Sequence, residues 1–335
     1  MRRALITGGA GFIGSHLAQE LLQRGEHVHV LDDSSSGDLS NIGHLISRPD
    51  LFLHRGSVRD EVLLAEIIGQ CDTVYHLASS VGVKRVMKHS IDTIQNNVHG
   101  IECVLRQALL KNQRVVFAST SELYGNSSQE PLREDQPVNL GPPTQSRWSY
   151  AYSKALGESL ALSYWRERHL PVVVIRLFNT VGPRQTGQYG MVIPTFVAQA
   201  LRGEPITVYG DGLQSRTFGF VKDVVRGFAD LASSDTAPGE IFNIGGTEET
   251  TIADLARAVK EVTGSPSDIV YIPYERAYGP GFADIRRRVP DLTKVSKSIG
   301  YRSSCGLRAI LETVIRHERD RIAAAQSSSA ASAVL

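Results

Sequence analysis

Apolar residues in the first half of the chain follow two alternating patterns. Short runs have the length and the β-branched residues of buried strands: RRALIT, HVHVLDD, LFLHRG, TVYHLA, RVVFAST and PVVVIRLFN. Between these runs lie longer stretches with apolar residues at helical spacing, such as FIGSHLAQELLQRG, EVLLAEIIGQ, residues 91–111 and the helix that contains Tyr150. Strand followed by helix, repeated in this way, predicts a doubly wound α/β fold with a parallel sheet covered on both faces.

The pattern changes after about Val181, where short elements are separated by Gly and Pro, as in VGPRQTGQYG and YERAYGPGF. This part predicts a smaller α/β domain that covers the carboxyl ends of the strands, where ligands bind in open α/β sheets. We therefore expect residues 1–180 to form the doubly wound domain and residues 181–320 to form a substrate-binding domain interleaved with it. The Ala/Ser-rich residues 321–335 predict a disordered tail.

Composition narrows the choice of partners. The 36 Lys and Arg residues nearly balance the 35 Asp and Glu residues, so no overall charge draws the chain to nucleic acid or to a membrane. The 3 cysteines have no C-x-x-C spacing, which argues against a disulfide framework and against a metal site. The N-terminus has no long apolar core of a signal peptide, and no later segment predicts a membrane span. We expect a soluble cytoplasmic protein without a metal ion.

A glycine-rich turn follows the first predicted strand. Gly8, Gly11 and Gly14 have the spacing G-x-x-G-x-x-G, and the next strand ends at Asp32, 18 residues beyond Gly14. Glycines allow a pyrophosphate to approach the backbone, and the new helix offers it unpaired N–H groups. Asp32 can accept hydrogen bonds from an adenosine ribose, and its charge would repel the extra phosphate of NADP. Asp32 and Asp33 could also simply open a loop, but the complete pattern predicts a Rossmann-like NAD site.

Tyr150 and Lys154 form a second candidate pair. They lie four residues apart in RWSYAYSKALGES, on one face of a predicted helix. By itself this spacing is common on ordinary amphipathic helices. With a dinucleotide site in the same chain, it becomes a candidate for catalysis.

The motifs together resemble the extended short-chain dehydrogenases/reductases that modify nucleotide sugars, the NAD-dependent epimerase/dehydratase family. The matching segments occur in the same order over nearly the whole chain: TGGAGFIGSHL, HLAS, NNVHG, ASTSELYG, Tyr150-x-x-x-Lys154, RLFNTVGPR, VYGDGLQSR and RRVPD. The resemblance implies a Rossmann-like domain with a smaller C-terminal lid, bound NAD and a UDP-sugar substrate.

The resemblance also implies which residues contact the cofactor. Besides Tyr150 and Lys154, they lie in the glycine turn and at the ends of the following strands and helices: Gly8, Gly11, Phe12, Ile13, Gly14, Asp32, Ser57, Val58, Leu77, Ala78, Ser79 and Asn97.

The expected role of Tyr150 is that of a base. For a phenol to be half ionised at neutral pH, its pKa must be lowered by roughly 3 units, which corresponds to about 4 kcal/mol. A neighbouring ammonium and a positively charged nicotinamide both favour the phenolate. Tyr150 can then take the proton from a sugar hydroxyl as the carbon gives hydride to NAD, while Lys154 lowers the tyrosine pKa and holds the nicotinamide ribose.

The remaining site residues are expected around the sugar nucleotide. Thr120 and Ser121, at the end of a strand, are placed to hydrogen-bond the reacting oxygen, although they could also cap that strand. The resemblance implies that the sugar diphosphate and the nucleoside are bound by residues of the last strand and of the lid: Asn179, Arg184, Tyr209, Gln214, Arg216 and Arg288.

Oxidation of the sugar at C4 leaves several reactions open. Reduction from the other face gives the 4-epimer, loss of a C6 carboxylate gives a pentose, and loss of water gives a 4,6-dehydratase product. Glu122 favours the last two, because a carboxylate beside Thr120 and Ser121 can move a proton at C5. RWSYAYSK and RRVPD resemble segments of UDP-glucuronate decarboxylases, although Ala151-Tyr152-Ser153 departs from the usual pattern between the tyrosine and the lysine.

We therefore expect an NAD-dependent UDP-glucuronate decarboxylase that forms UDP-xylose, with release of some UDP-4-keto-pentose left open. The alternatives are a UDP-hexose or UDP-hexuronate 4-epimerase, a 4,6-dehydratase and a non-catalytic NAD-sensing regulator. Lys84, Arg85 and Arg147 are candidates for binding the substrate carboxylate. The resemblance further implies a homodimer through a four-helix bundle, to which Leu160, Leu162 and Trp165 are apolar candidates.

Overall fold

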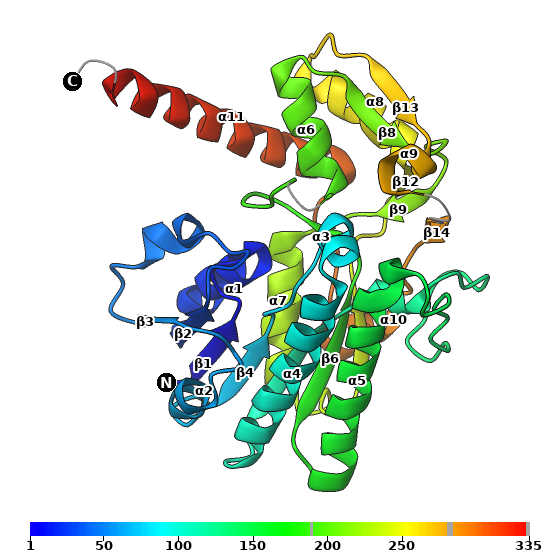
Figure 1. The fold of residues 1–335 in the computed structure, drawn as a ribbon. Coiled ribbons are helices and arrows are strands. Elements are labelled where there is room, and N and C mark those ends of the chain that lie inside the picture. Colours follow the sequence, from blue (N-terminus) through cyan, green and yellow to red (C-terminus); the bar gives the residue numbers. More distant parts are fainter. Residues whose placement is uncertain (188–189, 280–283, 333–335) are drawn as a thin grey trace.

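The computed structural model describes residues 1–187, 190–279 and 284–332, and it has a central parallel sheet (Figure 1). Within the described ranges this sheet has seven strands in the order β11-β6-β5-β4-β1-β2-β3. Their bounds are β1 Arg3–Thr7, β2 His27–Asp32, β3 Leu51–Arg55, β4 Thr73–His76, β5 Arg114–Thr120, β6 Val172–Leu177 and β11 Ile241–Ile244. The expected doubly wound α/β fold is confirmed.

Helices cover both faces of the sheet. The side chains of β1 alternate: Ala4 and Ile6 pack in one apolar cluster with α1 and α7, whereas Leu5 packs in the other with α2, α4 and α5. Both clusters are apolar because a parallel sheet is buried on both sides. The helices are α1 Phe12–Gln23, α2 Glu61–Ile68, α4 Ser90–Leu109, α5 Ser149–Arg168 and α7 Val221–Ser233.

The remaining elements lie mostly beyond the carboxyl ends of the sheet strands, at the top of Figure 1. Small sheets pair β12 with β9 and β14, β13 with β8, and β10 with β7. The helices are α3 Val83–Lys88, α6 Val192–Arg202, α8 Ile252–Thr263, α9 Tyr274–Tyr278, α10 Thr293–Ile299 and α11 Leu307–Ser332. The short strands are β7 Thr180–Val181, β8 Ile206–Tyr209, β9 Ser215–Thr217, β10 Gly219–Phe220, β12 Glu249–Thr251, β13 Ile269–Ile272 and β14 Arg287–Arg288, and the 3-10 turns are η1 Leu39–Leu45, η2 Ser121–Tyr124 and η3 Ser146–Trp148.

The chain returns to the central sheet after it has entered this upper part. Helix α7 packs against α1, and β11 pairs with β6 at the edge of the sheet, Ile241 opposite Val174. The boundary expected at residue 181 remains a prediction. The chain beyond residue 181 thus supplies the layer helix α7 and the edge strand β11 to the sheet of the N-terminal part.

Helix α11 extends into the segment for which the sequence predicts a disordered tail. It runs to Ser332, and its C-terminal end projects away from the rest of the chain (Figure 1). Alanine is the strongest helix former, so the alanine-rich segment can continue a helix begun by buried residues such as Leu311 and Val314. Residues 333–335 of that tail lie outside the described residues. No helix in the described ranges combines the length and hydrophobicity that a membrane span requires.

A buried ion pair joins α5 to the sheet beneath the site. Arg176 of β6 and Glu158 of α5 are 2.8 Å apart, and their side chains are 4% and 6% exposed. Ser119 of β5 donates a hydrogen bond of 2.5 Å to the same carboxylate, and the guanidinium of Arg176 lies 4.8 Å from the centre of the Tyr124 ring. Breaking such a pair leaves one charge buried without its counterion.

We expect the substitution Arg176→Met to lower the free energy of unfolding by about 3–5 kcal/mol, because it strands the Glu158 carboxylate. The double variant Arg176→Met/Glu158→Leu should regain much of this loss. Urea unfolding followed by circular dichroism measures both. The matched control is Arg48→Met, since Arg48 pairs with Asp50 on the surface, where solvent screens the pair and its loss should change the free energy of unfolding little. Equal loss in the single and double variants would contradict the explanation.

Candidate active site

A large cavity lies at the carboxyl ends of the sheet strands. Its volume is about 1800 Å³, and it extends from the glycine turn to the small sheets of the upper part. Residues at the ends of β1, β2, β4, β5 and β6 line it, together with residues of α5, β8 and β9. The fold therefore brings nearly all the predicted site residues into one chamber.

The glycine turn leaves room for a ligand at the start of α1. Gly8 has a φ of +72°, and a Cβ there would lie 2.9 Å from the backbone nitrogen of Ala78, while a Cβ on Gly14 would collide with the Gly8 carbonyl. Helix α1 begins at Phe12 with Gly11 as its N-cap, and no side chain caps it. Its first N–H groups and its positive dipole end are thus available to a pyrophosphate. These residues fit the expected NAD.

Asp32 lies at the end of β2 on the same side of the cavity. Its carboxylate accepts hydrogen bonds from the backbone N–H of Ala10, at 2.9 Å, and of Ser34, at 2.8 Å. Asp33 also orders the loop, through a 2.9 Å bond from the Ser35 N–H. Asp32 therefore orders the turn and also lines the cavity, and its contact with a ribose remains a prediction.

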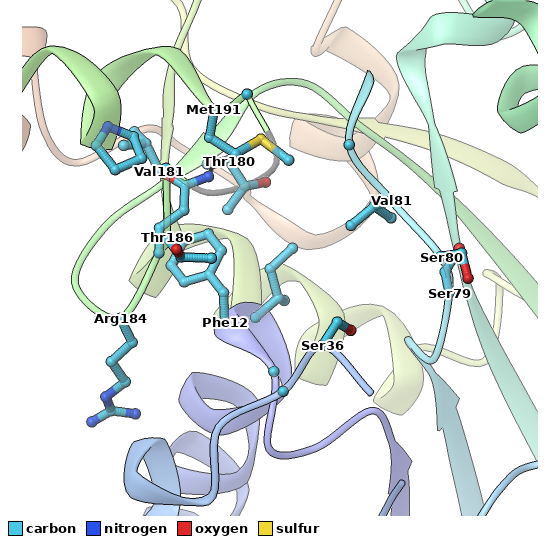
Figure 2. A pocket seen from close by; sticks show the side chains of 18 of the residues that line it. Phe12, Ser36, Ser79, Ser80, Val81, Thr180, Val181, Arg184, Thr186 and Met191 are labelled. Atoms are coloured by element: carbon cyan, nitrogen blue, oxygen red, sulfur yellow. Dashed lines mark hydrogen bonds between the residues drawn. The ribbon is translucent and has the colours of Figure 1, made fainter. Parts of the chain in front are cut away.

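The wall beside this turn comes from the ends of β3 and β4. Ser57, Val58, Leu77, Ala78 and Ser79 line the cavity, as Figure 2 illustrates for Ser79 opposite Phe12 and Ser36. Asn97 is buried behind this wall and is not among the described residues that line the cavity, so its expected contact with the cofactor remains a prediction. It accepts hydrogen bonds from the Ser79 hydroxyl and the Ser80 N–H, both 2.8 Å, and donates one to Ser153 of α5. This geometry makes Asn97 a support for the wall.

Tyr150 and Lys154 both line the cavity from the first turns of α5. The Lys154 ammonium donates a 2.8 Å hydrogen bond to the carbonyl of Ala118 and lies 4.8 Å from the centre of the Phe117 ring. Burial lowers the pKa of Lys154 to about 7, and the negative charge of Glu158 opposes this shift. The ion pair beneath the site therefore helps Lys154 keep its proton.

Thr120, Ser121 and Glu122 follow β5 directly and also line the cavity. Thr120 caps the turn by accepting a 3.2 Å bond from the Glu122 N–H, and it also hydrogen-bonds the Tyr150 hydroxyl. Burial and the charge of Glu122 raise the pKa of Tyr150, whereas Thr120 and Arg288 lower it. The sequence argument requires a lowered pKa, which these groups do not produce, and a contribution from the positive charge of the nicotinamide remains a prediction.

The predicted substrate residues meet around Asn179. Its side chain donates a 2.8 Å hydrogen bond to the carbonyl of Thr217 and accepts one from Arg288. Arg288 is also 3.7 Å from Glu122, which places it closer to the reacting groups than a phosphate-binding role alone requires. Tyr209, Gln214 and Arg216 line the cavity on the side of the small sheets.

Arg184 lies apart from this group. Its guanidinium donates hydrogen bonds to Ser15, at 3.3 Å, and to Gln19, at 2.8 Å, on α1, and contacts His44 of η1. In Figure 2 its side chain points away from Ser79 and Ser80. Its expected contact with the substrate remains a prediction, and its position favours the cofactor half of the cavity.

Two cavity residues have no signal in the sequence. Asp284 accepts a 2.9 Å hydrogen bond from Arg216 and one of 3.2 Å from the hydroxyl of Tyr274. Tyr274 opens the short helix α9 and Asp284 lies shortly before β14, and neither belongs to a motif or a periodic pattern. Of the candidates for carboxylate binding, the side chains of Lys84 and Arg85 lie outside the described residues, whereas Arg147 lines the cavity.

Comparisons with curated proteins place the chain among nucleotide-sugar enzymes. It is 40% identical to a UDP-N-acetyl-alpha-D-glucosaminuronate decarboxylase of Bacillus cytotoxicus, over 95% of this chain and 98% of that protein. It is 36% identical to UDP-glucuronic acid decarboxylase 1 of Arabidopsis thaliana, over 96% of this chain and 70% of that protein.

A solved structure has the same fold. The UDP-glucuronic acid 4-epimerase of Bacillus cereus, in complex with UDP-glucuronic acid and NAD, matches with a TM-score of 0.86 at 28% identity, over 95% of this chain and 99% of that one. The family model described as the NAD dependent epimerase/dehydratase family matches residues 4–245. The expected NAD dependence is thereby confirmed. This chain belongs to the NAD-dependent epimerase/dehydratase family.

Proposed function

We propose that this chain is an NAD-dependent decarboxylase of UDP-linked hexuronic acids. The observation that carries the proposal is the position of Glu122, which lines the cavity beside Tyr150 and lies 3.7 Å from Arg288. Simple epimerisation does not use a carboxylate there, whereas decarboxylation needs a proton at C5. The two decarboxylases similar to this chain, over 95% and 96% of its length, support the same reaction.

Side chains that line the cavity can carry out the proton transfers of this reaction. Tyr150 takes the proton of the C4 hydroxyl while the C4 hydrogen leaves as hydride, and bound NAD supplies the hydride acceptor and later the donor. The C6 carboxylate is then β to a ketone, so the C5–C6 bond breaks, carbon dioxide leaves and the electron pair moves to O4. Thr120 and Tyr150 hydrogen-bond this oxygen. The reaction takes up one proton from solvent, which Glu122 passes to C5, and Tyr150 returns to O4 the proton that it removed, as C4 is reduced.

The uronic acid itself is either of two related sugars. We propose UDP-glucuronate, which yields UDP-xylose, because relatives from plants and animals are named for it at 33–36% identity. The second candidate is the same sugar with an acetamido group at C2. It is favoured by the relative that is 40% identical to this chain, in a match that covers 98% of that relative. A cytoplasmic location remains a prediction from the sequence.

We further propose a homodimer through α4 and α5. Exposed apolar side chains gather on these neighbouring helices: Ile91 and Ile94 on α4, and Tyr152 and Leu156 on α5. The earlier candidates Leu160 and Leu162 pack instead against an internal cluster, and Trp165 packs near Gly239. The four exposed residues are therefore the better candidates for the four-helix bundle.

Incubation of the purified protein with each uronate, followed by mass spectrometry, tests the reaction. We expect a product that has lost one carbon dioxide, without net consumption of NAD. An unchanged mass with altered stereochemistry would favour the 4-epimerase and overturn the proposal.

The substitution Tyr150→Phe should lower kcat about a thousandfold, because the base is removed while the fold and the cofactor site remain. Tyr152→Phe is the matched control, since the Tyr152 hydroxyl donates a 2.8 Å hydrogen bond to the Gly141 carbonyl and Tyr152 is not among the described residues that line the cavity. Full turnover in Tyr150→Phe would count against the mechanism.

Light scattering after size exclusion tests the dimer. We expect Leu156→Glu to give a folded monomer, because it places a charge in the proposed interface. Val62→Glu, at an exposed position on α2, should leave the molar mass unchanged. A Leu156→Glu protein that remains dimeric would show that the bundle is not the interface.

A further inference from the structure

Arg147 is a buried arginine that the scheme above does not use. It lies in η3, three residues before Tyr150, and its side chain is only 8% exposed. It lines the same cavity as Tyr150, Glu122 and Arg288. Burying a guanidinium costs free energy, so a position for it beside the reacting groups indicates a function for its charge.

The side chain of Arg147 is held in one orientation. Its guanidinium carbon lies 4.8 Å from the centre of the Trp148 ring, and Trp148 is itself only 2% exposed. The indole N–H of Trp148 donates a 3.1 Å hydrogen bond to Gln145 in the preceding loop. A guanidinium stacked in this way presents its donors with little loss of conformational entropy on binding.

A carboxylate already lies beside this guanidinium. Asp284 places Oδ1 at 3.5 Å from Nη1 of Arg147, whereas its other oxygen, Oδ2, accepts a shorter 2.9 Å hydrogen bond from Arg216. The position in front of Arg147 therefore accepts a carboxylate, and Asp284 is held more closely by Arg216. A substrate carboxylate would form a geometrically equivalent contact.

Arg147, Arg216 and Arg288 all line the cavity, but they differ in their position along the chain relative to Tyr150. Arg216 and Arg288 belong to the small sheet of the upper part and are the expected diphosphate ligands. Arg147 instead precedes Tyr150 by three residues, about one helical turn, and both residues line the cavity. In a uronic acid C6 is only two bonds from C4. A group that binds the C6 carboxylate must therefore lie next to the group that acts at C4.

From these contacts we propose that Arg147 binds the carboxylate of the substrate and sets the preference for uronic acids over neutral hexoses. The inference rests on the proposed function and identifies a specificity residue for it. During decarboxylation the negative charge leaves the carboxylate and moves to O4. Arg147 therefore stabilises the bound substrate more than the transition state, and its removal should act on KM more than on kcat.

Calorimetric titration of the NAD-loaded protein tests the proposal, in a Tyr150→Phe background so that the substrate is not consumed. The ligands are UDP-glucuronate, UDP-glucose and UDP. We expect Arg147→Met to weaken UDP-glucuronate about tenfold to a hundredfold, the range for a lost charge-assisted hydrogen bond. UDP-glucose and UDP should change by less than about threefold, since they have no carboxylate to lose. Arg147→Lys should recover part of the difference.

The unchanged affinity for UDP also serves as the test that the variant is folded. Arg133→Met is the matched control, because Arg133 is exposed and pairs with Asp135 on the surface. Equal weakening of all three ligands would assign Arg147 to the diphosphate and overturn the proposal, as would unchanged binding of UDP-glucuronate. With Tyr150 restored, a fall in kcat at constant KM would also overturn it. Failure of the proposed function itself appears separately, as absence of carbon dioxide release by the unmodified protein.

Discussion

Parallel pairing of the strands is the constraint on which the site depends. Because β1, β2, β4, β5 and β6 all run in the same direction, their carboxyl ends meet at one edge of the sheet. That edge carries Gly8, Asp32, Ala78, Thr120 and Asn179, which are separated by up to 171 residues in sequence. Short turns after the strands therefore bring these residues together, whereas Tyr150 and Lys154 reach the same cavity from α5.

The second constraint is the cost of keeping charges in this cavity. Burial lowers the pKa of Lys154 to about 7 and that of Arg288 to about 10. Nearby carboxylates oppose both shifts: Glu158 acts on Lys154, and Glu122 on Arg288. Each carboxylate thus favours the charged form of its neighbouring cation, and the Arg176 guanidinium in turn pairs with Glu158. The charged pairs thus lie at two levels: Glu122 and Arg288 at the cavity, and Glu158 and Arg176 between α5 and the sheet.

The sequence predicts the parts of this site that are local. The glycine turn, Asp32 and the Tyr150–Lys154 pair each depend on spacing within one strand, turn or helix, and the structure places them together. Contacts between distant segments are not visible in such spacing. Arg184 crosses to α1, Asn97 lies behind the wall, and Asp284 joins two arginines, in each case through packing that no local pattern encodes. The segment before Ser332 is helical, whereas the sequence predicts a disordered tail there. Composition alone does not distinguish a solvated helix from a coil.

The return of β11 to the sheet edge limits how the two parts of the molecule can be separated by truncation or fusion. Because α7 packs on α1 and β11 pairs with β6, a gene cut near residue 181 would remove an edge strand and a layer helix from the N-terminal fragment. The exposed edge of β6 would then offer unpaired backbone groups to other chains. The cofactor-binding part is thus not an autonomous module that a fusion or a domain exchange could move intact.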